Sequence, residues 1–86
     1  MRTNLIREKW ARDEAVLNGW LAVPNGFSAE VMAHQGYDAL TVDLQHGVND
    51  ETNLIPMLQA ISTTDTVPVV RVPWLAPGII MKALEL

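Results

Sequence analysis

Two short segments of this 86-residue sequence carry side chains that could do chemistry. In the first, Asp43 stands three residues before His46, and in the second, Arg71 precedes Val72-Pro73-Trp74. A carboxylate can accept the proton of one imidazole nitrogen, which leaves the other nitrogen free to act as a base near neutral pH. An Arg offers a fork of donors that matches a carboxylate or an enolate oxygen. Together these residues predict a cleft in which an anionic substrate gains or loses a proton.

Each of these residues also has a structural role open to it. An Asp-x-x-His pair is frequent by chance, so Asp43 could cap the next helix and His46 could be a half-exposed surface residue. A single Arg after a strand is often an ion-paired surface residue, and Trp20 could be a core or rim aromatic rather than a wall of a substrate pocket. We interpret His34, which falls on a helix away from any strand end, as solvated surface.

Alternating helices and strands place the two segments. The expected elements are a helix over 5–17, a strand over 20–23, a helix over 28–35, a strand over 37–44, a helix starting near 49–53 and running to 61, a strand over 67–72, and a helix from 79 onward. Such alternation implies parallel strands joined by right-handed crossovers. Parallel α/β folds hold their chemistry at the carboxyl ends of the strands, where both segments fall.

Local signals set the expected ends of these elements. Asn18-Gly19 is expected to stop the first helix, and Ser28 is a fair N-cap for the second. Asn49 or Asp50 can cap the third, although Pro56 favours a start nearer Asn53. The aromatic and thioether side chains of Trp10, Trp74 and the four methionines are expected to fill the core.

Composition excludes several classes of function. Six basic and ten acidic residues give a net charge of −4, which disfavours a nucleic-acid or anionic-membrane surface. The absence of cysteine excludes a disulfide framework, a thiolate zinc site and a cysteine nucleophile. No glycine-rich nucleotide loop and no His-Glu-x-x-His is present. Without a signal-peptide or membrane-span pattern, a cytoplasmic protein is the default expectation.

Three strands leave a bare sheet edge, which a self-sufficient domain avoids. The chain has no linker or low-complexity segment, so we expect residues 1–86 to form one partial domain of a larger α/β protein. The apolar last helix, with Ile79, Ile80, Leu84 and Leu86, would also need a covering partner.

Three motifs, in order and spacing, resemble the HpcH/HpaI aldolase family, the metal-dependent 2-oxo acid aldolases related to the citrate lyase beta chain. These motifs are Gly19-Trp20-Leu21, the segment from Tyr37 to Gly47, and the segment from Pro68 to Trp74. The resemblance implies the amino-terminal part of a (β/α)₈ barrel, a helix plus three βα units. The whole family barrel, which takes about 250 residues, would cleave 4-hydroxy-2-oxo acids to pyruvate and an aldehyde.

The resemblance also implies roles for individual residues. His46 is the implied base, Asp43 its partner, and Arg71 the residue that holds the oxo-acid oxygens and stabilises the enolate. Trp20, Gln45 and Arg71 would contact the substrate, although many members have Gly-Glu where Leu44-Gln45 stands here.

For the complete protein, the resemblance implies magnesium or manganese, a small-molecule 2-oxo acid substrate and a homo-oligomer. The implied metal ligands, a Glu and an Asp on later strands, would lie beyond Leu86, so we expect no metal site and no activity from this chain alone. The leading hypothesis is therefore a fragment of a carbon-carbon lyase. The alternative is a non-catalytic binding or assembly module that completes its sheet with a second chain.

Overall fold

A parallel sheet of three strands, in the order β1-β2-β3, lies at the centre of the structure. This computed structural model describes residues 3–46 and 49–85. The strands are β1 (Asn18–Leu21), β2 (Ala39–Asp43) and β3 (Val67–Arg71). The helices are α1 (Leu5–Ala11), α2 (Gly26–Ala33), α3 (Glu51–Ile61) and α4 (Pro77–Glu85). The sequence prediction of one helix followed by three βα units is confirmed.

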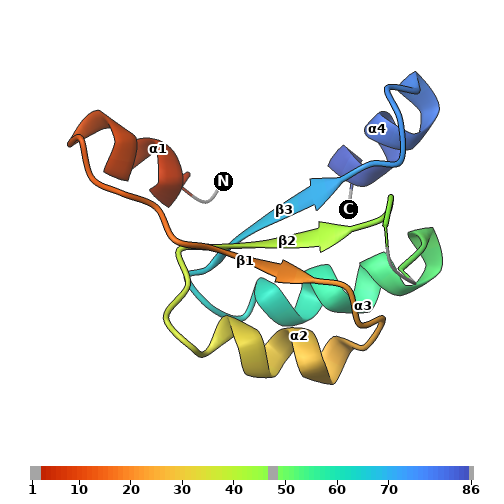
Figure 1. Cartoon of the computed structure of the whole chain (residues 1–86), viewed down its shortest axis with the longest axis horizontal. Coiled ribbons are helices and arrows are strands. Elements are labelled where there is room, and N and C mark those ends of the chain that lie inside the picture. Colours follow the sequence, from red (N-terminus) through yellow and green to blue (C-terminus); the bar gives the residue numbers. More distant parts are fainter. Residues whose placement is uncertain (1–2, 47–48, 86) are drawn as a thin grey trace.

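Strand β2 is buried along its whole length because it lies between β1 and β3. Leu40 and Val42 belong to the apolar core shared with α2 and α3, which lie side by side against the same face of the sheet (Figure 1). Successive side chains of a strand alternate between faces. Thr41 and Asp43 therefore face the other side, where they contact polar groups of the neighbouring strands.

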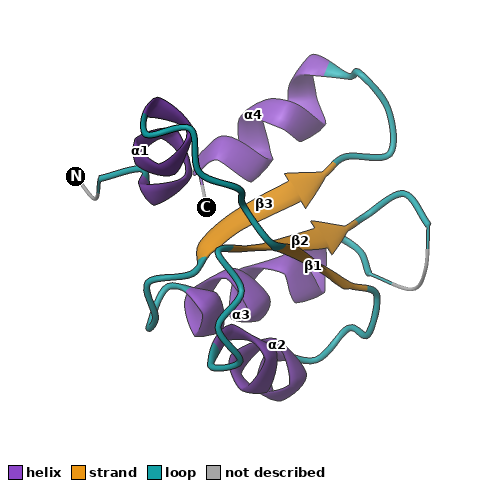
Figure 2. Ribbon diagram, turned by 60° about the vertical axis from the view of Figure 1, so that its left-hand side comes forward, coloured by secondary structure: helices purple, strands orange, loops and turns teal. Residues whose placement is uncertain are grey.

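All three carboxyl ends point the same way, toward the loops that precede α2, α3 and α4 (Figure 1). Asp43 and Arg71 are direct partners in the register of β2 and β3. Trp20 pairs with Thr41, two residues before Asp43, so its side chain lies on the same face as the Asp43 carboxylate. Helix α4 lies beyond β3 at the edge of the sheet (Figure 2).

The first helix is shorter than predicted and ends at Ala11, because Asp13 has a φ of 58° and the residues after it are mostly exposed. An amphipathic helix needs a packing partner, which residues 12–17 lack. Asn18 and Gly19 do not stop a helix but begin β1. The Leu17 carbonyl accepts hydrogen bonds from the backbone N–H groups of residues 38 and 39, which starts the sheet.

Helix α2 begins at a different cap from the predicted one, whereas α3 begins at Asp50, one of its two predicted caps, and not nearer Asn53. Asn25, not Ser28, caps α2, and its side chain accepts the backbone N–H of Ser28. Asp50 caps α3 through a capping box with Asn53, so Pro56 lies inside the helix rather than in its first turn. The missing N–H of Pro56 costs one helical bond, which the buried apolar face of α3 in the core offsets.

The prediction that tryptophans and methionines fill the core is wrong for most of them. Trp10 is 65% exposed and Trp74 is 71% exposed, while Met57 alone among the described methionines is fully buried. The prediction that His34 is exposed is confirmed. The predictions that involve Met1, Gly47 and Leu86 concern residues outside the described part of the chain. No helix in residues 3–46 and 49–85 is long and apolar enough to cross a membrane.

Gly19 permits the close approach of β1 to the core, and we predict that Gly19→Ala destabilises the fold. A Cβ there would stand 2.6 Å from Leu40 Cδ2 and 3.1 Å from the Tyr37 ring, and Leu40 is fully buried and cannot move aside. Overpacking of this kind costs about 1 to 3 kcal/mol. Urea unfolding followed by circular dichroism measures the change.

Gly78→Ala is the matched control, because nothing lies within 4 Å of a Cβ at this position in α4. The control should be neutral or stabilise the chain by up to about 1 kcal/mol through helix propensity. Equal stability of the two variants would contradict the close approach at Gly19.

Candidate functional site

A buried ion pair joins the carboxyl ends of β2 and β3. Arg71 donates from Nε to Oδ1 of Asp43 at 3.0 Å and from Nη2 to Oδ2 at 2.5 Å. The Asp43 side chain is only 3% exposed, whereas that of Arg71 is 35% exposed. The guanidinium therefore neutralises a buried carboxylate along one edge and reaches solvent elsewhere, as a bidentate pair allows.

Trp20 from β1 completes this cluster from the other side. Its indole Nε1 donates to Oδ2 of Asp43 at 2.9 Å, and its ring lies 5.0 Å from the guanidinium carbon of Arg71. That distance is within the range of a cation–π contact. Trp20 is still 49% exposed, so its ring forms part of an open wall rather than part of the core.

The same carboxylate also fixes the start of the loop that follows β2. Oδ1 of Asp43 accepts the backbone N–H groups of Gln45 at 2.9 Å and of His46 at 3.0 Å. The side chains of Gln45 and His46 are exposed. Among the described residues, no hydrogen bond joins the His46 imidazole to Asp43. The structure thus brings Trp20, Asp43 and Arg71 together and sets His46 beside them through its backbone.

This hydrogen bonding holds the pKa of Asp43 well below its usual range. The side-chain hydrogen bonds from Arg71 lower the pKa most, and the Trp20 indole and the two backbone N–H groups lower it further, against the opposing effect of desolvation. Asp43 is therefore a permanent anion at neutral pH. Its expected role as a cap of the next helix is wrong, because Asp50 caps α3.

Asn49 is a residue at this end of the sheet that the sequence prediction treated only as a possible cap. It is buried, and its Nδ2 donates to the Leu21 carbonyl of β1 at 3.0 Å. It ties the end of the loop that carries His46 to the end of β1. The clue in the sequence is a small amide directly before the capping Asp50, but its partner, 28 residues away, is visible only in the fold.

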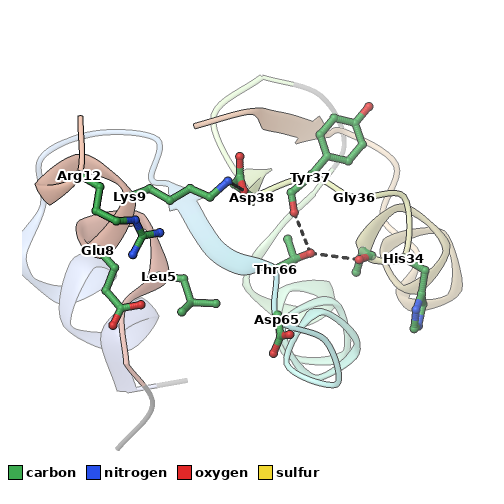
Figure 3. A pocket seen from close by; sticks show the side chains of 11 residues that line it. Leu5, Glu8, Lys9, Arg12, His34, Gly36, Tyr37, Asp38, Asp65 and Thr66 are labelled. Atoms are coloured by element: carbon green, nitrogen blue, oxygen red, sulfur yellow. Dashed lines mark hydrogen bonds and ion pairs between the residues drawn. The ribbon is translucent and has the colours of Figure 1, made fainter. Parts of the chain in front are cut away.

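A cavity lies at the opposite end of the sheet. It encloses about 420 Å³ between α1 and the amino ends of β2 and β3 (Figure 3). Both of its basic side chains are ion-paired, since Lys9 meets Asp38 at 2.6 Å and Arg12 meets Glu14 at 2.7 Å. The buried Thr66 hydroxyl donates to the carbonyls of Ala33 and Tyr37. In parallel barrels this end serves stability, and the carboxyl ends carry the chemistry.

The described residues do not form a metal site. Within residues 3–46 and 49–85, no three His, Cys, Asp or Glu side chains converge. Both oxygens of Asp43 are engaged by Arg71 and Trp20, and Asp50 caps α3. Magnesium and manganese prefer several free oxygen ligands, so these residues do not fit such an ion by themselves.

Residues 18–86 match the HpcH/HpaI aldolase/citrate lyase family. The chain is 37% identical over 83 residues to 5-keto-4-deoxy-D-glucarate aldolase of Escherichia fergusonii, covering 96% of this chain and 32% of that protein. It is 38% identical over 82 residues to hydroxypyruvate/pyruvate aldolase of Rhizorhabdus wittichii, covering 95% and 33%. The chain thus spans about a third of the length of the curated relatives it matches.

Solved structures of the same family share this fold. The chain superimposes with a TM-score of 0.80 and 36% identity on the crystal structure of an HpcH/HpaI aldolase/citrate lyase family protein from Burkholderia cenocepacia. The match covers 96% of this chain and 34% of that one. The sequence prediction that the chain corresponds to a part of such a barrel is confirmed.

We predict that Asp43 makes the free energy of unfolding depend on pH in the acidic range. Because its pKa is lowered in the folded chain, its contribution is complete above the unfolded carboxyl pKa of about 3.9. The contribution is lost as the pH falls below that value toward the lower folded pKa. Asp43→Asn should therefore be less stable than wild type at pH 7, and the difference should shrink between about pH 4 and pH 2.

Urea unfolding at a series of pH values measures this difference. Asp65→Asn, at an exposed position in the connection before β3, is the matched control and should follow wild type throughout. A difference in the free energy of unfolding between wild type and Asp43→Asn that stays constant with pH would contradict the ion pair.

Proposed function

The chain belongs to the HpcH/HpaI aldolase/citrate lyase family, and from this premise we propose that it supplies the first three βα units of a carbon-carbon lyase. The proposed substrate is a 4-hydroxy-2-oxo acid, which is cleaved to pyruvate, or a related oxo acid, and an aldehyde. The names of two relatives, a keto-deoxy-sugar-acid aldolase and a hydroxypyruvate/pyruvate aldolase, support this class of substrate.

The observation that carries the proposal is the Arg71 guanidinium at the carboxyl end of β3. It is bound along one edge by Asp43 and is partly exposed on the rest. A planar cation held in this way matches the carboxylate and oxo oxygens of a 2-oxo acid. Trp20 provides an adjoining aromatic wall, and Gln45 and His46 follow on the neighbouring loop.

In the proposed reaction, His46 removes the proton of the 4-hydroxyl group. The bond between C3 and C4 then breaks, its electron pair forms the enolate of the oxo acid, and the aldehyde leaves. Arg71 stabilises the negative charge on the enolate oxygen, as positioned donors do. A proton returned to C3 completes the oxo acid, so atoms and charge balance. Asp43 stays ionised throughout because of its lowered pKa.

Other parts of the site are proposed to come from the portion of the family barrel that this chain does not cover. The described residues do not fit the divalent metal ion that the family resemblance implies. We propose that magnesium or manganese and its carboxylate ligands belong to the complete protein, together with assembly into a homo-oligomer.

A chimaera tests the proposal. This chain would replace the matching third of the Escherichia fergusonii aldolase, whose sequence it follows over 83 residues. We predict that the chimaera cleaves the substrate, and that His46→Ala lowers turnover by about 10² to 10⁴-fold, the usual contribution of a general base. Arg71→Lys should also lower turnover severely, because the point charge of a lysine does not replace the planar fork of donors of a guanidinium.

His34→Ala is the matched control, because His34 is an exposed histidine at the C-cap of α2, at the end of the sheet opposite the carboxyl ends of the strands. It should leave turnover unchanged. Full activity of both His46→Ala and Arg71→Lys in a folded chimaera would overturn the assignment.

The chain alone should release no pyruvate from a 4-hydroxy-2-oxo acid at any magnesium or manganese concentration. The proposal gives this chain a base, His46, and a cation, Arg71, but its described residues hold no group of three metal-ligating side chains. A coupled pyruvate assay on the purified chain measures this. Release above the metal-only background that disappears in His46→Ala would show that the chain assembles a site unaided.

Among the described residues, the outer edges of β1 and β3 pair with no further strand, which favours the second candidate, a non-catalytic assembly module. Leu75 is 92% exposed and Leu84 is 82% exposed beside the β3 edge. This module would form a discrete oligomer with cooperative unfolding, which chromatography with light scattering and thermal melting would detect. A monomer or an undefined aggregate contradicts it and leaves the lyase proposal standing.

A further inference from the structure

We infer that Trp20 and Asp43 are positioning residues for Arg71, and that Asp43 serves Arg71 rather than the His46 imidazole. Together they determine which edge of the guanidinium meets the substrate. The inference rests on the proposed function for the identity of the ligand, but the geometry that supports it belongs to the ligand-free chain.

The first step concerns the donors of Arg71. A guanidinium carries five N–H bonds, and Asp43 takes one from Nε and one from Nη2. The other three, two on Nη1 and one on Nη2, have no partner among residues 3–46 and 49–85. They lie along the outer edge, where two parallel N–H bonds can bind a planar oxyanion.

The second step concerns rotation of the guanidinium. The bidentate contact with Asp43 fixes its plane, and the Trp20 ring at 5.0 Å covers one of its faces. Trp20 also donates to Oδ2, the oxygen that receives Nη2 of Arg71. A loss of Trp20 would therefore loosen both the face contact and the carboxylate that holds the edge.

The third step concerns the carboxylate itself. Asp43 is surrounded by five N–H donors, and those from His46 and Gln45 come from the backbone. An imidazole N–H would have to displace one of these bonds to reach it. The sequence interpretation that paired Asp43 with the His46 ring is therefore replaced by a pairing with Arg71.

Nuclear magnetic resonance of the ¹⁵N-labelled chain tests the inference without substrate. The Nε–H signal of Arg71 is identified by its loss in Arg71→Lys. We expect its exchange with water to be slower than that of the exposed Arg7 by about tenfold or more, as a charge-assisted hydrogen bond implies. Protection should fall in Trp20→Phe and disappear in Asp43→Asn.

Trp10→Phe is the matched control, because Trp10 is exposed on α1 and makes no contact with the cluster. It should leave the Arg71 exchange rate unchanged. Trp20→Phe keeps the charge of Asp43. If Asp43→Asn does not fold, the exchange rate of Arg71 in Trp20→Phe still tests whether the guanidinium is held in place. Exchange of Arg71 as fast as that of Arg7, or equal protection in wild type and Trp20→Phe, would overturn the inference.

Oxalate is a planar dianion shaped like the enolate of an oxo acid. Its binding to the chimaera, with and without Asp43→Asn, distinguishes a positioning role of Asp43 from an effect of its charge alone. Charge alone predicts that Asp43→Asn binds oxalate more tightly, because a competing carboxylate is removed. Positioning predicts weaker binding by about tenfold or more, because the fork is no longer held. Tighter binding by the folded variant would overturn the inference. Protected Arg71 in the chain, together with a folded wild-type chimaera that neither binds oxalate nor cleaves a 4-hydroxy-2-oxo acid, would instead count against the proposed function.

Discussion

The burial of one carboxylate at the end of the central strand is the constraint on which the site depends. An ionised group removed from water must be paired and hydrogen-bonded, since its desolvation is otherwise too costly. Asp43 meets this need with donors from both neighbouring strands and from the loop after β2. The ends of the three strands and the backbone of His46 are thereby fixed around the two carboxylate oxygens of Asp43.

The ion pairs at the two ends of β2 differ in how many of their hydrogen-bonding groups are satisfied. Asp38, directly before the strand, accepts the Leu17 backbone N–H and pairs with Lys9, which fastens α1 to the amino end of the sheet. All charges of this ion pair are satisfied within the described residues. At the carboxyl end, Asp43 satisfies only one edge of Arg71 and leaves part of the guanidinium in contact with solvent. Free donor capacity is therefore found at the end where parallel barrels carry their chemistry.

Exposure differs within the cluster in a way that fits these roles. Asp43 is buried, Arg71 and Trp20 are partly exposed, and the side chains of Gln45 and His46 are open to solvent. A gradient from a rigid buried anchor to accessible groups is what a preorganised site requires, because the anchor limits the motion of the groups that meet a ligand. In the proposed complete barrel, the sheet would continue from the outer edges of β1 and β3, which pair with no other strand in residues 3–46 and 49–85.

The alternation of elements, the parallel strands and the family could be predicted from sequence, because apolar periodicity and strand-end motifs are local signals. The presence of Asp43 and Arg71 at one end of the sheet followed from the same alternation, whereas only the family resemblance implied that Trp20 belongs to the site. Helix limits did not, since α1 lacks a packing surface after Ala11 and core packing of α3 overrides Pro56. Only the tertiary structure decided that Asp43 pairs with Arg71 and Trp20 rather than with the nearby His46 ring. Sequence distance favours the neighbour three residues away, but the strand register brings Arg71 directly opposite.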